Sequence, residues 1–274
     1  MRVHVIQVGR VFVDESFFNA TTRLRAFRDA FANRGATFPV YSFLVEHPDG
    51  HIVIDTGWHH EVMQLSAVKR ICRLLKVDAF VTPDETVGPR MRALGLRPED
   101  VRLVIPTHLD GDHAGGIGHF PDSDILVHRA EYEYVTTSPF GKMRSMQRFW
   151  PDWFKPVFYD LEPEPYGAFS HSHAVTDRGD VRIVPTPGHS PAHVSPVFER
   201  DGKKLFFAGD HLVRQNWITA DGVKLSAMLH VYRKHARDTN RRLHDFVREF
   251  PTIVLPSHDA DGAANLERGE PVRV

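Results

Sequence analysis

Four short apolar runs in this chain each end in residues of the types that bind metal ions, and this repeated arrangement constrains the fold more than any other feature. The first run, residues 101–106, leads into the segment THLDGDHAGG, which carries four candidate ligands: His108, Asp110, Asp112 and His113. The other three runs lead to one candidate each, in IVPTPGHSPAH (His189), LFFAGDH (Asp210) and IVLPSH (His258). A short apolar run bounded by turn residues is typical of a buried strand, so each candidate is expected at the carboxyl end of a strand.

Any metal site in this chain must be built from histidine and carboxylate. The 274 residues include 18 histidines but one cysteine, Cys72, which excludes an intramolecular disulfide and every multi-cysteine zinc site. A lone histidine or aspartate at a strand end is often only a turn or cap residue, but the four sites together favour metal binding. Two hydrolytic ions need several converging ligands, and one loop cannot surround both. The ligands are therefore expected to come from all four strand ends.

The chain alternates between strand-like and helix-like segments, and strands dominate both halves. Strands are predicted at residues 3–8, 40–46, 51–55, 101–106, 124–128, 181–184, 193–199, 204–208 and 252–255. Apolar residues at helical spacing predict helices at residues 61–75, 84–94, near Glu131, and at 232–250. Because no repeat, low-complexity linker or charge block divides the chain, residues 1–274 are expected to form one domain.

Charge and hydropathy narrow the classes of partner. Lysine and arginine total 34 and aspartate and glutamate total 35, which gives a net charge of −1. A nucleic-acid-binding protein normally carries a basic excess, so nucleic acid is not expected as a partner. No apolar run is long enough for a signal peptide or a membrane span, and we therefore expect a cytoplasmic protein that acts on a small molecule.

The ordered segments THLDGDHAGG, TPGHSPAH, AGDH and PSHD, preceded by IDTG at residues 54–57, resemble the motifs of the metallo-β-lactamase superfamily. The resemblance covers residues 40–260 and implies an α/β fold, the four-layer αββα sandwich, with a dinuclear site at the edge between its sheets. By motif position it implies a ligand set for each ion: His108, Asp110 and His189 for the first, Asp112, His113 and His258 for the second, and Asp210 between them. Asp55 resembles the carboxylate that orients a ligand histidine.

One position departs from the family pattern. The family usually has histidine where this chain has Asp110, which gives HxDxDH in place of HxHxDH. A carboxylate can still bind zinc, and two divalent ions, zinc first, are the expected cofactors. The additional oxygen donor makes iron or manganese more plausible than usual. If Asp110 instead turns outward, the first site is weak.

The opening FPVYSFLVEHPDGHIVIDTGW and the segment TPGHSPAH are similar to those of the N-acyl homoserine lactonase-like branch. This similarity implies a hydrolase that opens a lactone or related cyclic ester with a metal-bridging hydroxide. It also implies that Asp112 passes a proton to the leaving alkoxide. The branch carries a substrate-binding tyrosine where this chain has Val213, and Tyr232 or His211 could take its place.

Other activities fit the same motifs, and the role of one aromatic segment is open. The carboxylate of Asp110 also suits a diiron-type oxidoreductase or oxygen-handling protein, and the hydrolase could act as a β-lactamase or thioesterase. Residues 140–158 are rich in aromatic residues and methionine. They could line a substrate pocket through Phe149 and Trp153, with Tyr232 nearby, could fill the core, or could form the interface of a homodimer.

Overall fold

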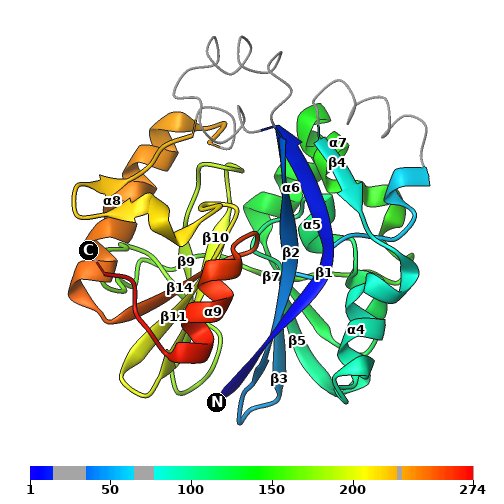
Figure 1. The fold of residues 1–274 in the computed structure, drawn as a ribbon, viewed down its shortest axis with the longest axis horizontal. Helices are drawn as coiled ribbons and strands as arrows, with labels where there is room; N and C mark the ends of the chain where they lie inside the picture. The colour runs from blue at the N-terminus through cyan, green and yellow to red at the C-terminus, as the bar shows by residue number, and fades with distance from the viewer. Residues whose placement is uncertain (15–34, 65–76, 227–229, 274) are drawn as a thin grey trace.

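The computed structural model describes residues 1–14, 35–64, 77–226 and 230–273. Within them two β-sheets face each other, and helices cover the outer face of each sheet (Figure 1). This is the four-layer αββα arrangement that the motifs implied, and the predicted fold class is confirmed. Cys72 and most of the helix predicted at residues 61–75 lie outside the described residues.

The first sheet has seven strands in the order β4-β1-β2-β3-β5-β6-β7. Their bounds are β4 (Val77–Phe80), β1 (Arg2–Asp14), β2 (Gly35–Glu46), β3 (His51–Ile54), β5 (Val101–Ile105), β6 (Asp124–His128) and β7 (Val157–Tyr159). Strands β4, β1, β2 and β3 pair antiparallel, whereas β3, β5, β6 and β7 pair parallel. The parallel half places the ends of β3 and β5 side by side at one edge of the sheet.

The second sheet has five strands in the order β14-β11-β10-β9-β8. Their bounds are β14 (Thr252–Pro256), β11 (Lys203–Gly209), β10 (Val194–Arg200), β9 (Val181–Pro185) and β8 (His173–Ala174). The β11–β14 pair is parallel, with Phe207 opposite Leu255, and the other pairs are antiparallel. A separate small hairpin joins β12 (Ile218–Thr219) to β13 (Gly222–Val223).

Six α-helices and six short 3-10 helices are described. The α-helices are α4 (Val87–Ala93), α5 (Gly111–Ala114), α6 (Arg129–Thr137), α7 (Pro139–Ser145), α8 (Arg233–Glu249) and α9 (Ala260–Arg268). The 3-10 helices are η2 (Val62–Gln64), η3 (Pro83–Glu85), η4 (Pro98–Asp100), η5 (Ile117–His119), η6 (Gln147–Phe149) and η7 (Gln215–Trp217). Helices α8 and α9 lie outside the second sheet, and α4, α6 and α7 lie outside the first (Figure 1).

Strand β11 shows why the chain forms four layers. Its side chains alternate between the two faces of the sheet, as strand geometry requires. Phe207 lies in the core between the sheets, where its ring centroid is 5.2 Å from that of Phe43 of β2. Phe206 points the other way, into the core under α8, with its ring 5.7 Å from Phe246. Because both faces of the central strands are apolar, each sheet needs a second sheet on one face and helices on the other.

Candidate metal centre

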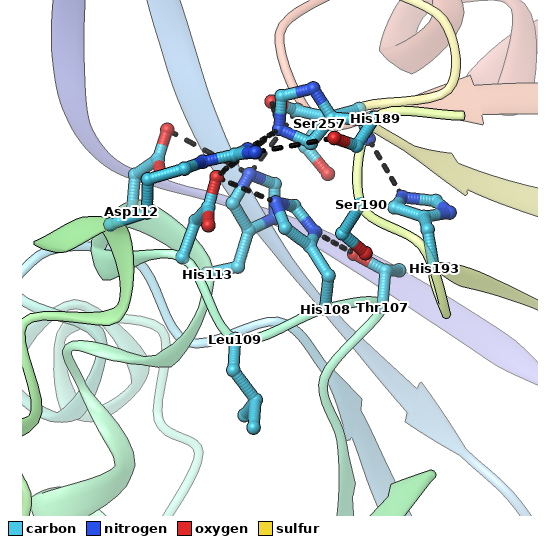
Figure 2. Close-up of polar contacts among 12 residues, drawn as sticks. Thr107, His108, Leu109, Asp112, His113, His189, Ser190, His193 and Ser257 are labelled. Carbon is cyan, nitrogen blue, oxygen red and sulfur yellow. Dashed lines mark hydrogen bonds and ion pairs between the residues drawn. The ribbon is translucent and has the colours of Figure 1, made fainter. Parts of the chain in front are cut away.

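The carboxyl ends of β5, β9, β11 and β14 meet at one edge of the sandwich. They bring together the loop and helix α5 after β5, which carry His108 to His113, and the single residues His189, Asp210 and His258. Backbone hydrogen bonds join the two sheets here: Val194 N donates to Thr107 O at 3.0 Å, and Tyr41 N donates to Ser257 O at 2.9 Å. Figure 2 shows side chains from the green, yellow and orange parts of the chain converging on one point.

The seven candidate ligands fall into two groups, each with ligand atoms within 4.8 Å of one another. The first cluster is His108, Asp110 and His189, and the second cluster is Asp112, His113, Asp210 and His258. Asp210 faces both clusters: its Oδ1 lies 3.0 Å from His258 Nε2, and its Oδ2 lies 3.3 Å from His189 Nε2. This geometry suits the bridging position expected for Asp210.

Several of these atoms are buried in a way that suits a cation. Among the described side chains, His108 Nε2, His113 Nε2 and Asp210 Oδ1 are shielded from solvent and form no hydrogen bond of good geometry. Buried polar atoms nearly always have a partner. A divalent cation in the second cluster would satisfy the atoms of His113 and Asp210 together, and the donor set of two imidazoles and two carboxylates is one that zinc accepts. The residues of the second cluster therefore fit a metal ion.

Asp55, directly after β3, supports the second cluster from behind. Its buried carboxylate lies 2.8 Å from His113 Nδ1 and accepts hydrogen bonds from Thr107 N at 2.7 Å and from the hydroxyl of Ser257 at 3.1 Å. His258 Nδ1 donates to Pro39 O at 2.8 Å. Because each of these Nδ1 atoms is held by an acceptor, Nε2 of both rings faces the cluster with its lone pair.

The electrostatics of the second cluster favour a positive charge. Burial alone would lower the pKa of His113, but the carboxylates of Asp55, Asp210 and Asp112 outweigh burial and raise that pKa well above its ordinary value. Burial alone would raise the pKa of Asp210, yet His113, His258 and His189 hold it well below its ordinary value. The group therefore binds either protons or a metal cation, and the two compete for the same nitrogen atoms.

The first cluster contains a cation of the chain itself. Arg144, near the end of α7, donates through Nη2 to Asp110 Oδ2 and His189 Nε2, and through Nη1 to His189 O at 3.2 Å. Burial alone would raise the pKa of Asp110, but Arg144 and His108 outweigh burial and hold it well below its ordinary value. Asp110 thus turns inward, toward His108 and His189. Arg144 was not predicted as a site residue, because nothing in its spacing relates residue 144 to the ligand segments.

Glu131 of α6 ties together the loops that carry the first cluster. Its carboxylate accepts from Ser190 Oγ at 2.7 Å and from Leu109 N at 3.4 Å. Burial raises the pKa of Glu131 to about 7. Ser190 and Leu109 each adjoin a candidate ligand, so Glu131 sets the distance between His189 and the segment at 108–113. This residue was predicted only as part of a helix.

Glycine is required where the strand ends crowd together. Gly209 precedes Asp210 with a φ of +50°, and a Cβ there would lie 2.6 Å from Thr107 Oγ1 and 2.7 Å from His193 Nε2. His193 Nε2 accepts a hydrogen bond from Asp210 N at 3.3 Å. His193 therefore supports the Asp210 turn, and its Nδ1 lies 2.8 Å from Thr186 Oγ1 in the segment that leads to His189. A side chain at residue 209 would push these strand ends apart.

The residues proposed to contact substrate lie in different surroundings. Phe149 stacks on His59 at 4.3 Å between ring centroids, and Trp153 is 40% exposed. Tyr232 is half-buried, and its ring meets Tyr134 edge to face at 6.3 Å. His211 was expected as one possible replacement for the tyrosine that is missing at Val213. It is fully buried, with both ring nitrogens shielded from solvent, so it does not face a substrate.

The sequence matches the family described as Metallo-beta-lactamase superfamily over residues 35–258. The chain belongs to this superfamily, as its motifs implied, and it is a metal-dependent hydrolase. None of the described helices is long and apolar enough to cross a membrane.

Several relatives are named N-acyl homoserine lactonases, which confirms the predicted resemblance. The chain is 29% identical over 247 residues to N-acyl homoserine lactonase AttM of Agrobacterium fabrum, covering 84% of this chain and 85% of that protein. It is 30% identical over 207 residues to an N-acyl homoserine lactonase of a Bacillus species, covering 73% and 71%. A solved N-acyl homoserine lactone hydrolase, with N-hexanoyl-L-homoserine bound at its catalytic metal center, has a TM-score of 0.74 at 22% identity and covers 99% of this chain and 96% of that one.

Proposed function

We propose that this enzyme opens the ring of a lactone, an internal carboxylic ester, by attack of water at the two clusters. The second cluster carries the proposal, because its two histidines and two carboxylates converge and include buried atoms that form no hydrogen bond of good geometry. The names of the lactonase relatives direct the choice of substrate class. The fold by itself does not, since it serves many reactions.

The second cluster is the place where a divalent ion would be held. When bound, such an ion supplies Lewis acidity that polarises a carbonyl and lowers the pKa of water. Zinc is the first choice, with iron or manganese as alternatives because half of the donors are carboxylates. The donors of the first cluster would also suit an ion, and two ions were expected, but Arg144 already contacts Asp110 and His189 there.

Asp112 is the residue that we expect to move the proton. Its Oδ2 lies 3.5 Å from His258 Nε2 and 3.7 Å from His113 Nε2, and its side chain is 15% exposed, so it stands between the cluster and solvent. In the reaction it would take a proton from the attacking water and return it to the alkoxide released when the ring C–O bond breaks. General acid–base transfer of this kind contributes about 10²–10⁴-fold to a rate.

The diiron-type oxidoreductase stays the alternative of a different class. It was favoured by the carboxylate of Asp110, but that carboxylate is paired with Arg144. A β-lactamase or thioesterase would use the same clusters on another acyl bond. These activities are best tested beside the lactonase activity, on protein whose metal content has been measured.

A panel of lactones, an aryl ester, a β-lactam and a thioester should be offered to the wild type and to a His113→Ala variant. The expected result is ring opening of lactones by the wild type and loss of this activity in the variant. His171→Ala, at an exposed histidine, is the matched control and should behave like the wild type. Full lactone turnover by His113→Ala would place the active site elsewhere, and oxygen consumption without hydrolysis would favour the oxidoreductase.

A homodimer was one expectation for residues 140–158, and we propose it as a further property of this surface. Four of its apolar side chains are at least 39% exposed: Phe140, Met143, Trp153 and Val157. Sedimentation of the wild type and of a Trp153→Ser variant would test this, since a dimer should weaken in the variant. A monomer at all concentrations would contradict it.

A further inference from the structure

The guanidinium of Arg144 lies among the atoms with which the first cluster would bind an ion. Its Nη2 donates to Asp110 Oδ2 and His189 Nε2, which lie 3.1 Å from each other. His108 Nε2 lies 3.3 Å from the same oxygen of Asp110. We propose that Arg144 replaces one metal ion, so that the chain binds a single ion in the second cluster and offers an arginine N–H to the carbonyl oxygen of its substrate.

Helix α7 fixes Arg144 in this position. A Cβ at Gly141 would lie 2.7 Å from Tyr134 O of α6, so the two helices are in close contact. The Arg144 side chain is only 13% exposed, its Cζ lies 5.4 Å from the centre of the Phe140 ring, and its Nη1 donates to His189 O. A guanidinium held by a helix, an aromatic ring and a backbone carbonyl is a built part of the site, and its planar shape suits these fixed contacts.

The unusual carboxylate of Asp110 and the position of Arg144 have one explanation. A guanidinium needs an anionic partner, which a histidine at residue 110 would not supply. The three carboxylates that face the clusters, Asp110, Asp112 and Asp210, carry three negative charges, and one divalent ion with one guanidinium carries three positive charges. A second divalent ion in the first cluster would lie in contact with the guanidinium, and like charges at such a distance repel strongly in a buried site.

The same side chain can polarise a carbonyl, and this step rests on the proposed function. Guanidinium carries five N–H donors, and the described contacts of Arg144 use two on Nη2 and one on Nη1. No hydrogen bond from the second N–H of Nη1 or from that of Nε is formed with the described residues. Val213, at the position where the lactonase-like branch carries a tyrosine, is buried and apolar. An oxyanion donor typically contributes about 10²–10³-fold to kcat.

Metal stoichiometry tests the replacement. The wild type and the variants Arg144→Ala and Arg144→Met should be saturated with Zn²⁺, freed of loosely bound metal and analysed by elemental mass spectrometry. We expect one ion per chain in the wild type and two in both variants. Arg144→Met is included because its larger side chain leaves less empty space and is less disruptive to folding than alanine. Co²⁺ titration followed by visible absorption gives a second readout. Arg148→Ala, at an exposed arginine of η6, is the matched control and should keep one ion.

The proposed replacement would be overturned if the wild type bound two ions. It would also be overturned if both Arg144 variants folded, filled the second cluster and still bound only one ion. Added guanidinium chloride at millimolar, non-denaturing concentration sharpens the test. In Arg144→Ala, it should expel the second Zn²⁺ and restore part of the lactonase activity. In Arg144→Met, the methionine side chain fills the space that guanidinium would occupy, and the activity should not recover. A kcat for lactones that is equal in the wild type and Arg144→Met would overturn the role as a carbonyl donor.

The outcomes also separate this inference from the proposed function. One ion in the wild type, a second in the variants, and no hydrolysis of any lactone would support the replacement and contradict lactone opening. Lactone turnover by a wild-type protein that holds two ions would support lactone opening and contradict the replacement.

Discussion

The two clusters share their chemical donors but differ in what balances their charge. The second cluster has two carboxylates, histidines fixed by Asp55 and by Pro39 O, and buried atoms that form no hydrogen bond of good geometry. The first cluster has one carboxylate, and the chain's own Arg144 contacts it. The difference teaches that ligand types in the right order are not enough to predict how many ions bind, because a neighbouring helix can supply the positive charge.

Removal of Asp210 should have the largest effect, because this residue faces both clusters. Asp210→Ala would leave His113 and His258 with one carboxylate fewer beside them, and we expect loss of the bound ion and no measurable hydrolysis. Metal analysis and kcat/KM for a lactone check this. His108→Ala provides the comparison: it removes a candidate ligand of the first cluster and none of the second, and this variant should keep its ion. An Asp210→Ala protein that retains both metal and activity would contradict the assignment.

Asp110→His restores the usual family motif and removes the anionic partner of Arg144. We expect this variant to gain a second Zn²⁺ ion, because three imidazoles then face the first cluster and the guanidinium loses the charge that holds it. It should also shift metal preference toward zinc, since imidazole is a softer donor than carboxylate. Competition between Zn²⁺ and Mn²⁺, followed by elemental analysis, measures both effects. Unchanged stoichiometry and preference would show that residue 110 does not control the first cluster.

Asp55→Asn should weaken the second cluster without removing any of its candidate ligands. The amide keeps the size of the carboxylate but loses the charge beside His113 Nδ1. Loss of such a supporting carboxylate typically lowers metal affinity by about 10–100-fold. Competition with a chelator of known affinity gives the value. Asp49→Asn, at a partly exposed carboxylate in the β2–β3 turn, is the control and should leave metal affinity unchanged. Equal affinities in all three proteins would count against the support role.

Glu131→Gln should have the smallest effect on the metal centre, and its main effect should be on the pH dependence of stability. The pKa of Glu131 is about 7 in the folded protein, above its ordinary value of 4.5, so the folded state holds a proton that the unfolded state releases between these values. The stability of the wild type should therefore fall relative to the variant as the pH rises from 4.5 to 7, by up to ~1.4 kcal/mol per pH unit. Denaturant unfolding at pH 5, 6, 7 and 8, at equal metal content, measures this difference. Parallel curves for the two proteins would contradict it.

The sequence predicted those parts of the fold that depend on local pattern. Apolar runs followed by turn residues predicted β5, β9, β11 and β14. The ordered motifs predicted the seven candidate ligands, which lie together at one edge of the structure. Short edge strands such as β7 and β8 were missed, because two or three residues carry too little pattern to recognise. The extension of β1 to Asp14, beyond the predicted residue 8, was missed as well.

The parts of the site that depend on tertiary packing could not be predicted. Arg144 and Glu131 reach the first cluster only because α7 and α6 pack beside it, and neither has a spacing that relates it to a ligand motif. Their surroundings in the sequence are those of an ordinary helix. Asp55 was recognised only because the IDTG segment resembles a family motif, and its hydrogen-bonding partners Thr107, His113 and Ser257 come from two segments far from it in the sequence.

The hydrogen bond from Ser257 to Asp55 has a consequence for the order of folding. It joins residues 202 positions apart, and the carboxylate that it meets also receives Thr107 from the middle of the chain. Contacts between such distant positions form late, because a large loop must close first. During synthesis His113 and Asp55 leave the ribosome long before β14 does. The second cluster can therefore close only after β14 has been synthesised, so an ion is captured late and not by the first half of the polypeptide.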